Sequence, residues 1–137
     1  MKSNEELVSF VLKIREMLEE HKMELDPILY KCFPTGCCGS VSSVLGKLLK
    51  ENGFGIFEYV SGQSEAFNIN SHAWLEKEGI ICDITADQFG ELKLPKVYVG
   101  TYNSFYKSFC VEHRRPYYQC YDVMWDESCY NLLKRYL

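Results

Sequence analysis

The spacing of apolar residues changes at about residue 51, and this change constrains the fold more than any other feature of the chain. Before it, apolar residues recur every three or four positions, from 4 to about 24 and again from 38 to 51. That spacing is typical of amphipathic helices. Asn52-Gly53 then supplies the stop signal of a left-handed helix cap. The first part of the sequence therefore predicts two helices.

Local signals define the ends of these helices. Ser3 or Asn4 can cap the first one, because a short polar side chain can accept a hydrogen bond from the free amides of the first turn. The segment 32–39 contains Pro34, Gly36 and Gly39, which prevent a regular element through most of it. We expect a loop there, followed at once by the second helix.

Strand-like runs follow the second helix. They cover 55–60, 71–76 and 79–84, and the polar segment 62–70 is expected to be a loop. The short turn 76–79 predicts an antiparallel hairpin between the second and third runs.

The rest of the chain carries weaker patterns. Val97–Val99 follows Pro95 and predicts a further strand, while 128–137 has the spacing of a helix. The aromatic-rich segment 101–119 has no clean period and stays unassigned. Helices first and strands second predict an α+β fold, in which N-terminal helices pack on a small antiparallel sheet. A chain of 137 residues is expected to form one domain, residues 1–137.

Charge and hydropathy exclude some partners and locations. The net charge of −4 argues against nucleic acid as an obligatory partner, because binding phosphates requires a concentrated basic surface. No apolar run approaches the roughly 18 residues that span a bilayer, and the N-terminus is acidic where a signal peptide would be basic. We therefore expect no membrane partner and a cytoplasmic location.

The cysteines are expected to be mostly free thiols. Seven is an odd number, and we expect no export to an oxidising compartment. Structural zinc sites usually take ligands from Cys-x2-4-Cys or His-x3-5-His pairs, whereas Cys37 and Cys38 are adjacent. No metal or organic cofactor is expected.

Three residues of the predicted elements form a chemical set. Cys38 lies where the second helix begins, and there the free amides and the positive end of the helix dipole stabilise a thiolate. His72 lies on a strand and can exchange a proton near neutral pH. Asp83 lies on the next strand, where a carboxylate can orient the imidazole. With a turn centred on Lys77-Glu78, position 72 falls opposite position 83.

These residues carry a resemblance to a known family. The run from Cys38 to Gly53, the strand from Ser71 to Glu76 and the strand from Gly79 to Thr85 resemble the core of the transglutaminase-like branch of the papain-like cysteine hydrolases. They cover about half of the chain. The resemblance implies Cys38 as the nucleophile, His72 as the general base and acid, and Asp83 as the orienting carboxylate.

Other residues near this set have open roles. Cys37 is the rival nucleophile, but the family pattern places a small residue and a glycine where Ser42 and Gly53 follow Cys38. The backbone amide of Cys38 can donate one hydrogen bond to an oxyanion, and a second donor is needed. Papain-like proteases use an upstream glutamine, which is missing here; Thr35, Tyr30 and Gln63 are alternatives.

Two more positions are candidates for the cleft. Trp74 shares a strand face with His72 and is expected either to shield the imidazole or to belong to the core. Gln88 follows the Asp83 strand closely and can line the cleft. The basic group 113–115 is interpreted as a solvated turn in preference to an anion site.

The set predicts thiol-dependent acyl transfer or hydrolysis at an amide, as in a cysteine peptidase, a deamidase or a transglutaminase. The substrate is expected to be a small amide, a peptide or a protein. Two alternatives remain: a non-catalytic interaction module that uses the aromatic segment 98–130, and a pseudoenzyme on the same fold. The acceptor of the acyl group and the oligomeric state stay open.

Overall fold

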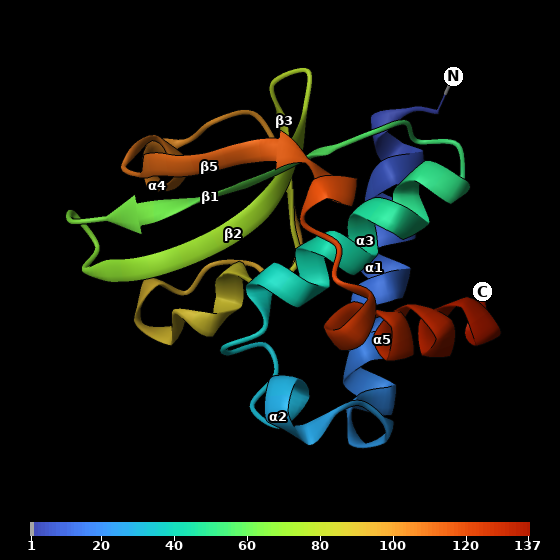
Figure 1. The fold of residues 1–137 in the computed structure, drawn as a ribbon. Helices are drawn as coiled ribbons and strands as arrows, with labels where there is room; N and C mark the ends of the chain where they lie inside the picture. The colour runs from blue at the N-terminus through green and yellow to red at the C-terminus, as the bar shows by residue number, and fades with distance from the viewer. Residues whose placement is uncertain (1) are drawn as a thin grey trace.

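A computed structural model describes residues 2–137 and combines helices with one sheet (Figure 1). The α-helices are α1 (Asn4–His21), α2 (Pro27–Tyr30), α3 (Cys38–Glu51), α4 (Ser104–Lys107) and α5 (Val123–Tyr136). The strands are β1 (Glu58–Ser64), β2 (Ile69–Lys77), β3 (Ile80–Asp83), β4 (Tyr98–Gly100) and β5 (Cys110–Pro116). Short 3-10 helices are η1 (Lys22–Glu24), η2 (Ala86–Gln88), η3 (Gly90–Leu92) and η4 (Tyr117–Gln119).

The strands form one five-stranded antiparallel sheet in the order β4-β3-β2-β1-β5. Figure 1 shows α1, α3 and α5 gathered on one side of the molecule, with the strands extending away from them. The predicted α+β class and the antiparallel sheet are confirmed.

The two N-terminal helices follow the sequence signals closely. The side chain of Ser3 accepts a hydrogen bond from the amide of Glu6 at 3.1 Å and caps α1. Helix α3 runs from Cys38 to Glu51, as predicted. It ends where Gly53 adopts a positive φ of 86°, which a glycine accepts without a steric penalty.

The boundaries of three elements were predicted wrongly. Strand β1 begins at Glu58 and continues to Ser64, and β2 begins at Ile69, so the expected loop over 62–70 is reduced to residues 65–68. Helix α5 begins at Val123 instead of Ser128, because Asp122 caps it by accepting a hydrogen bond from Met124.

The unassigned segment 101–119 contains α4 and β5, and the basic group 113–115 lies in a strand instead of a turn. Strand β5 occupies the sheet edge beside β1, and its residues are almost all exposed. A strand exposed on both faces has no alternating hydropathy, which explains why the sequence pattern missed it.

The sheet separates two groups of buried side chains. One group joins α1, α3 and α5 to the face that carries Leu75, and the other lies on the face that carries Val60, Trp74 and Ile81. Residues of α4 cover this second face. Because side chains alternate along a strand, His72 shares the face of Trp74.

The hairpin register differs from the prediction. Lys77 pairs with Ile80, and Glu78 and Gly79 form the turn with positive φ values of 51° and 79°, as a tight two-residue hairpin turn requires. Continuing this register places Trp74, and not His72, opposite Asp83. The predicted pairing is wrong by two residues, and a two-residue shift leaves His72 and Asp83 on the same face.

In residues 2–137, no helix combines the length and the apolar character that crossing a bilayer would require.

Candidate active site

His72 and Asp83 form a buried pair on the second face of the sheet. His72 Nε2 lies 2.7 Å from Asp83 Oδ2, and both side chains are almost inaccessible to solvent. The other oxygen of Asp83 accepts a hydrogen bond from the backbone amide of Thr85 at 3.0 Å. The hydroxyl of Tyr106, on α4, donates to Asp83 Oδ2 at 2.7 Å. The carboxylate is therefore fixed from three directions.

Electrostatics favour the charged form of this pair. Burial by itself lowers the pKa of His72, but the charge and the hydrogen bond of Asp83 outweigh it and raise the pKa to about 9. Burial by itself raises the pKa of Asp83, yet His72, Thr85 and Tyr106 bring it below its ordinary value. A buried imidazolium beside a carboxylate follows from these shifts.

Cys38 is the first residue of α3, and its side chain is partly buried. The N-cap residue Cys37 makes no side-chain hydrogen bond to the first turn. The amides at this helix end are therefore not occupied by a capping side chain, and they can stabilise negative charge.

The surroundings of Cys38 favour the ionised form of its thiol. Burial by itself raises its pKa, but the interaction with the His72 imidazole and the backbone N–H of Ala73 outweigh this effect. The net pKa lies below the ordinary value for a thiol. A thiol with a lowered pKa beside an imidazole with a raised pKa favours transfer of the proton from sulfur to nitrogen.

Helix α3 packs on the sheet face opposite to that of His72. Cys38 nevertheless reaches His72, because the pairing of β3 with β2 ends early. Pairing between β2 and β3 extends only to Leu75 and Cys82. The part of β2 that carries His72 and Ala73 consequently has no β3 residue paired beside it. The first turn of α3 approaches this open stretch, where the Ala73 N–H faces the Cys38 thiol.

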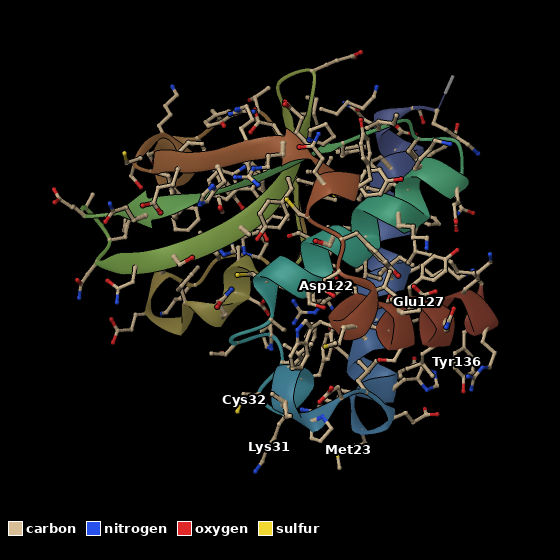
Figure 2. All side chains as sticks on the ribbon, viewed as in Figure 1. Met23, Lys31, Cys32, Asp122, Glu127 and Tyr136 are labelled. Carbon is tan, nitrogen blue, oxygen red and sulfur yellow. The ribbon has the colours of Figure 1, made fainter. Side chains whose placement is uncertain are left out.

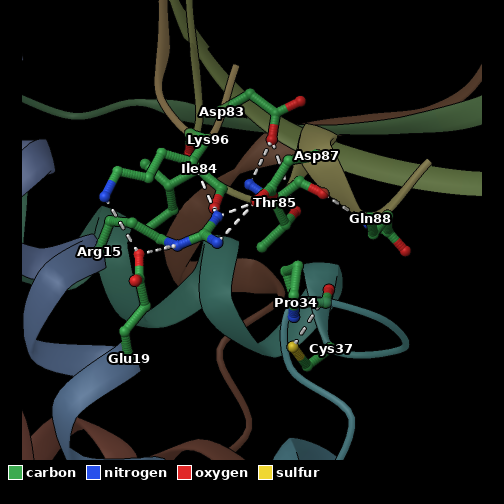
Figure 3. A network of polar contacts seen from close by, with 10 residues as sticks. All are labelled: Arg15, Glu19, Pro34, Cys37, Asp83, Ile84, Thr85, Asp87, Gln88 and Lys96. Carbon is green, nitrogen blue, oxygen red and sulfur yellow. Dashed lines mark hydrogen bonds and ion pairs between the residues drawn. The ribbon is translucent and has the colours of Figure 1, made fainter. Parts of the chain in front are cut away.

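Cys37 is placed differently from its neighbour. It is buried, and its thiol donates to the carbonyl of Pro34 at 3.6 Å (Figure 3). Burial and the nearby Cys38 raise the pKa of Cys37 to about 12. Cys37 therefore carries a protonated, inaccessible thiol at neutral pH.

Of the remaining five cysteines, Cys82 directly precedes Asp83 on β3, and all seven cysteines are free thiols. Cys82 and Cys129 are buried, and burial raises the pKa of each. Cys32 is exposed and projects outward at the end of α2 (Figure 2).

Gln88 lies against His72. Its side-chain nitrogen is 3.4 Å from His72 Nδ1 and donates to the carbonyl of Thr85 at 3.0 Å. Its backbone is held by the neighbouring residue, because Asp87 pairs with the buried Arg15 of α1 through two contacts of 2.7 Å (Figure 3). The segment after β3 is thus anchored to α1, and Gln88 covers the imidazole nitrogen that does not face Asp83.

Trp74 is completely buried in the core group of the second face, and its ring centroid lies 5.7 Å from that of His72. Three further aromatic rings surround the imidazole at centroid distances from 5.1 to 6.3 Å: Phe89, Phe105 and Phe109. The two roles considered for Trp74 coincide, since it belongs to the core and also screens His72 from water.

The residues considered as second oxyanion donors are less well placed. Thr35 is exposed in the loop before α3, and its amide donates to the carbonyl of Cys32 at 2.7 Å. Tyr30 is buried, and its hydroxyl is bonded to Ser40 at 2.8 Å. Gln63 is exposed on β1.

Sequence reasoning missed Tyr106 and Thr85 as partners of Asp83. Thr85 follows Asp83 by two positions, and a carboxylate that accepts the amide two residues later is a common turn. This signal was available in the sequence. Tyr106 had no such signal, because its hydroxyl reaches Asp83 only when α4 packs across the sheet.

Residues 2–137 contain no group of three or more His, Cys, Asp or Glu side chains placed to share a metal ion. Comparison of the chain with family models, curated proteins and solved structures gives no match.

Proposed function

We propose that this protein is a thiol-dependent acyltransferase or hydrolase that acts on amides, with a papain-like core of the transglutaminase-like type. Cys38 is the nucleophile, His72 the general base and acid, and Asp83 the orienting carboxylate. The observation that carries the proposal is the pairing of a lowered thiol pKa at Cys38 with a raised imidazole pKa at the buried His72–Asp83 pair.

The reaction follows from this charge distribution. The Cys38 thiolate attacks the carbonyl carbon of the substrate, and the carbonyl oxygen takes the negative charge. The His72 imidazolium then gives its proton to the departing amine, and a thioester remains on Cys38. Water or a second amine attacks the thioester after giving a proton to His72, which restores the thiolate and the imidazolium. Water yields a peptidase or a deamidase, and an amine yields a transglutaminase.

The packing of the aromatic segment reduces the support for an interaction module. Its rings at Phe105, Tyr106, Phe109 and Tyr117 are buried, and three of them belong to the core group of the second face. The interior of the protein therefore accounts for part of the aromatic content of this segment, whereas Tyr118 and Trp125 remain exposed.

Acylation of the protein by p-nitrophenyl acetate tests the chemistry. We expect a burst of nitrophenolate and an acetyl thioester that maps to Cys38 and is removed by hydroxylamine. The burst should disappear in Cys38→Ala and persist in Cys37→Ala, which serves as the matched control. Acetylation confined to the exposed Cys32 and Cys110, at the rate of an ordinary thiol, would refute the assignment.

A second assay identifies the acceptor. A glutamine-containing protein such as casein is incubated with a fluorescent primary amine, and three products are measured: released ammonia, incorporated fluorophore and new amino termini. Ammonia with fluorophore indicates a transglutaminase, ammonia alone a deamidase, and new termini a peptidase. If none of the three products forms from casein, the substrate must be an amide of another kind.

A further inference from the structure

Gly39 and Tyr59 approach each other closely beside the nucleophile. A Cβ atom placed on Gly39 would lie 3.1 Å from the hydroxyl oxygen of Tyr59. Gly39 directly follows Cys38 in the first turn of α3, whereas Tyr59 lies on β1. Tyr59 pairs with Leu75 and so points to the sheet face on which α3 packs. The hydroxyl therefore occupies space that a side chain at position 39 would fill.

The hydroxyl of Tyr59 lies beside the first turn of α3. Cα–Cβ bonds in an α-helix tilt toward the N-terminus, so the space next to a Cβ of Gly39 lies on the side of Cys38. The free amides of the first turn point in the same direction. The hydroxyl of Tyr59 and the backbone N–H of Cys38 are therefore both at the first turn of α3, and the phenol is near enough to Cys38 for its charge to act on Tyr59.

The hydroxyl of Tyr59 is available to a ligand. Among residues 2–137, no hydrogen bond engages it, and no buried side-chain oxygen lacks a partner, so the oxygen must contact solvent. Burial, followed by the nearby groups Cys38, Cys120 and Asp126, raises the pKa of Tyr59 to about 12. The phenol consequently stays protonated and remains a hydrogen-bond donor throughout the neutral range.

We infer that Tyr59 supplies the second hydrogen-bond donor of the oxyanion hole, together with the backbone N–H of Cys38. The inference rests on the proposed function, because it needs an acyl substrate at Cys38. When the thiolate attacks, the carbonyl oxygen gains a negative charge next to the nucleophile, and two donors aimed at that point stabilise it. Tyr59 fills the place left by the missing upstream glutamine. The absence of a side chain at Gly39 keeps this space open.

The variant Tyr59→Phe tests the inference, because it removes only the hydroxyl. Acylation by p-nitrophenyl acetate forms an oxyanion, whereas alkylation by iodoacetamide displaces iodide at a saturated carbon and forms none. We expect acylation of Cys38 to fall about 100-fold, with alkylation of Cys38 unchanged. The matched control is Tyr118→Phe, which removes an exposed hydroxyl on η4 and should change neither rate.

The outcomes separate the two proposals. Equal acylation rates in Tyr59→Phe and the unaltered protein would overturn the inference while leaving the proposed function intact. A parallel loss of acylation and alkylation would assign Tyr59 a structural role and would also overturn it. Absence of acylation at Cys38 in the unaltered protein would instead refute the proposed function, and the inference with it.

Gly39→Ala provides a second measurement that does not alter Tyr59 itself. The added methyl group would lie 3.1 Å from the hydroxyl and should shift it by a few tenths of an ångström, while alanine favours the helix. We expect slower acylation, unchanged alkylation, and no loss of stability in urea. Acylation at the unaltered rate in this variant would show that the exact position of the hydroxyl is unimportant and would contradict the role of Tyr59.

Discussion

His72 Nε2 contacts Asp83 Oδ2 at 2.7 Å although the two residues are diagonal neighbours across the β2–β3 hairpin. Diagonal positions lie farther apart than directly opposite ones, so the ring must reach toward the carboxylate with its far nitrogen. Nδ1, the nitrogen nearer the backbone, is left on the side of Gln88. One imidazole nitrogen therefore contacts the carboxylate, and the other lies beside the side-chain amide of Gln88.

The variant Asp83→Asn should raise the pKa of the Cys38 thiol. An amide keeps the shape of the carboxylate but cannot stabilise the imidazolium, and the imidazolium in turn stabilises the thiolate. Each unit of pKa reduces the thiolate fraction about 10-fold at pH values below the pKa. We expect alkylation of Cys38 by iodoacetamide at pH 6 to slow by at least that factor. The control Glu112→Gln changes an exposed carboxylate on β5. Equal rates of Cys38 alkylation in Asp83→Asn and Glu112→Gln would contradict the role of Asp83.

The pH profile of kcat/KM for an amide substrate should be bell-shaped. The pKa of His72 is raised to about 9, so the imidazolium that protonates the leaving amine persists up to that pH and is lost above it. The pKa of Cys38 is lowered, so the thiolate is lost only as the pH falls through a value below that of an ordinary thiol. The pKa values that define the two limbs are macroscopic constants of the coupled Cys38–His72 pair. A rate that keeps increasing beyond pH 9 would indicate an ordinary thiol and exclude this mechanism.

Tyr106→Phe should lower the free energy of unfolding by about 1–2 kcal/mol, because it removes a hydrogen bond to a buried carboxylate. Urea denaturation measures the loss. Tyr98 is the matched control, since its ring stacks on that of Tyr106 while its exposed hydroxyl donates only to the carbonyl of Thr101. Equal stability losses in Tyr106→Phe and Tyr98→Phe would show that Asp83 does not depend on the Tyr106 hydroxyl.

Gly46→Ala should destabilise the protein although alanine is the better helix former. The exchange gains up to about 1 kcal/mol in helix propensity. However, the new Cβ would lie 2.6 Å from the Cβ of Tyr117, an atom that cannot move without the backbone. Overpacking of this kind costs about 1–3 kcal/mol, so we expect a net loss in urea denaturation. Gly90→Ala, where no atom lies within 4 Å, should be close to neutral. A stabilised Gly46→Ala would mean that α3 can move away from η4.

The sequence by itself determined the elements whose signals are local. Periodic apolar residues and end signals predicted α3 from Cys38 to Glu51, and they therefore placed Cys38 at a helix start. The turn at Gly79 predicted the hairpin that carries His72 and Asp83. These predictions succeeded because helix caps, periodicity and tight turns depend on residues a few positions apart.

Only the tertiary structure decided how these elements meet. The register of the hairpin depended on which two residues adopt positive φ. Glu78 is one of them, although glutamate rarely adopts a positive φ. Strand β5 shows no alternation because it lies exposed at an edge, and Tyr106 reaches Asp83 only across the packed sheet. Tyr59 of β1 likewise approaches Gly39 of α3 only because the helix packs on the sheet. Contacts between distant segments arise from the burial of whole faces, so no short stretch of sequence encodes them.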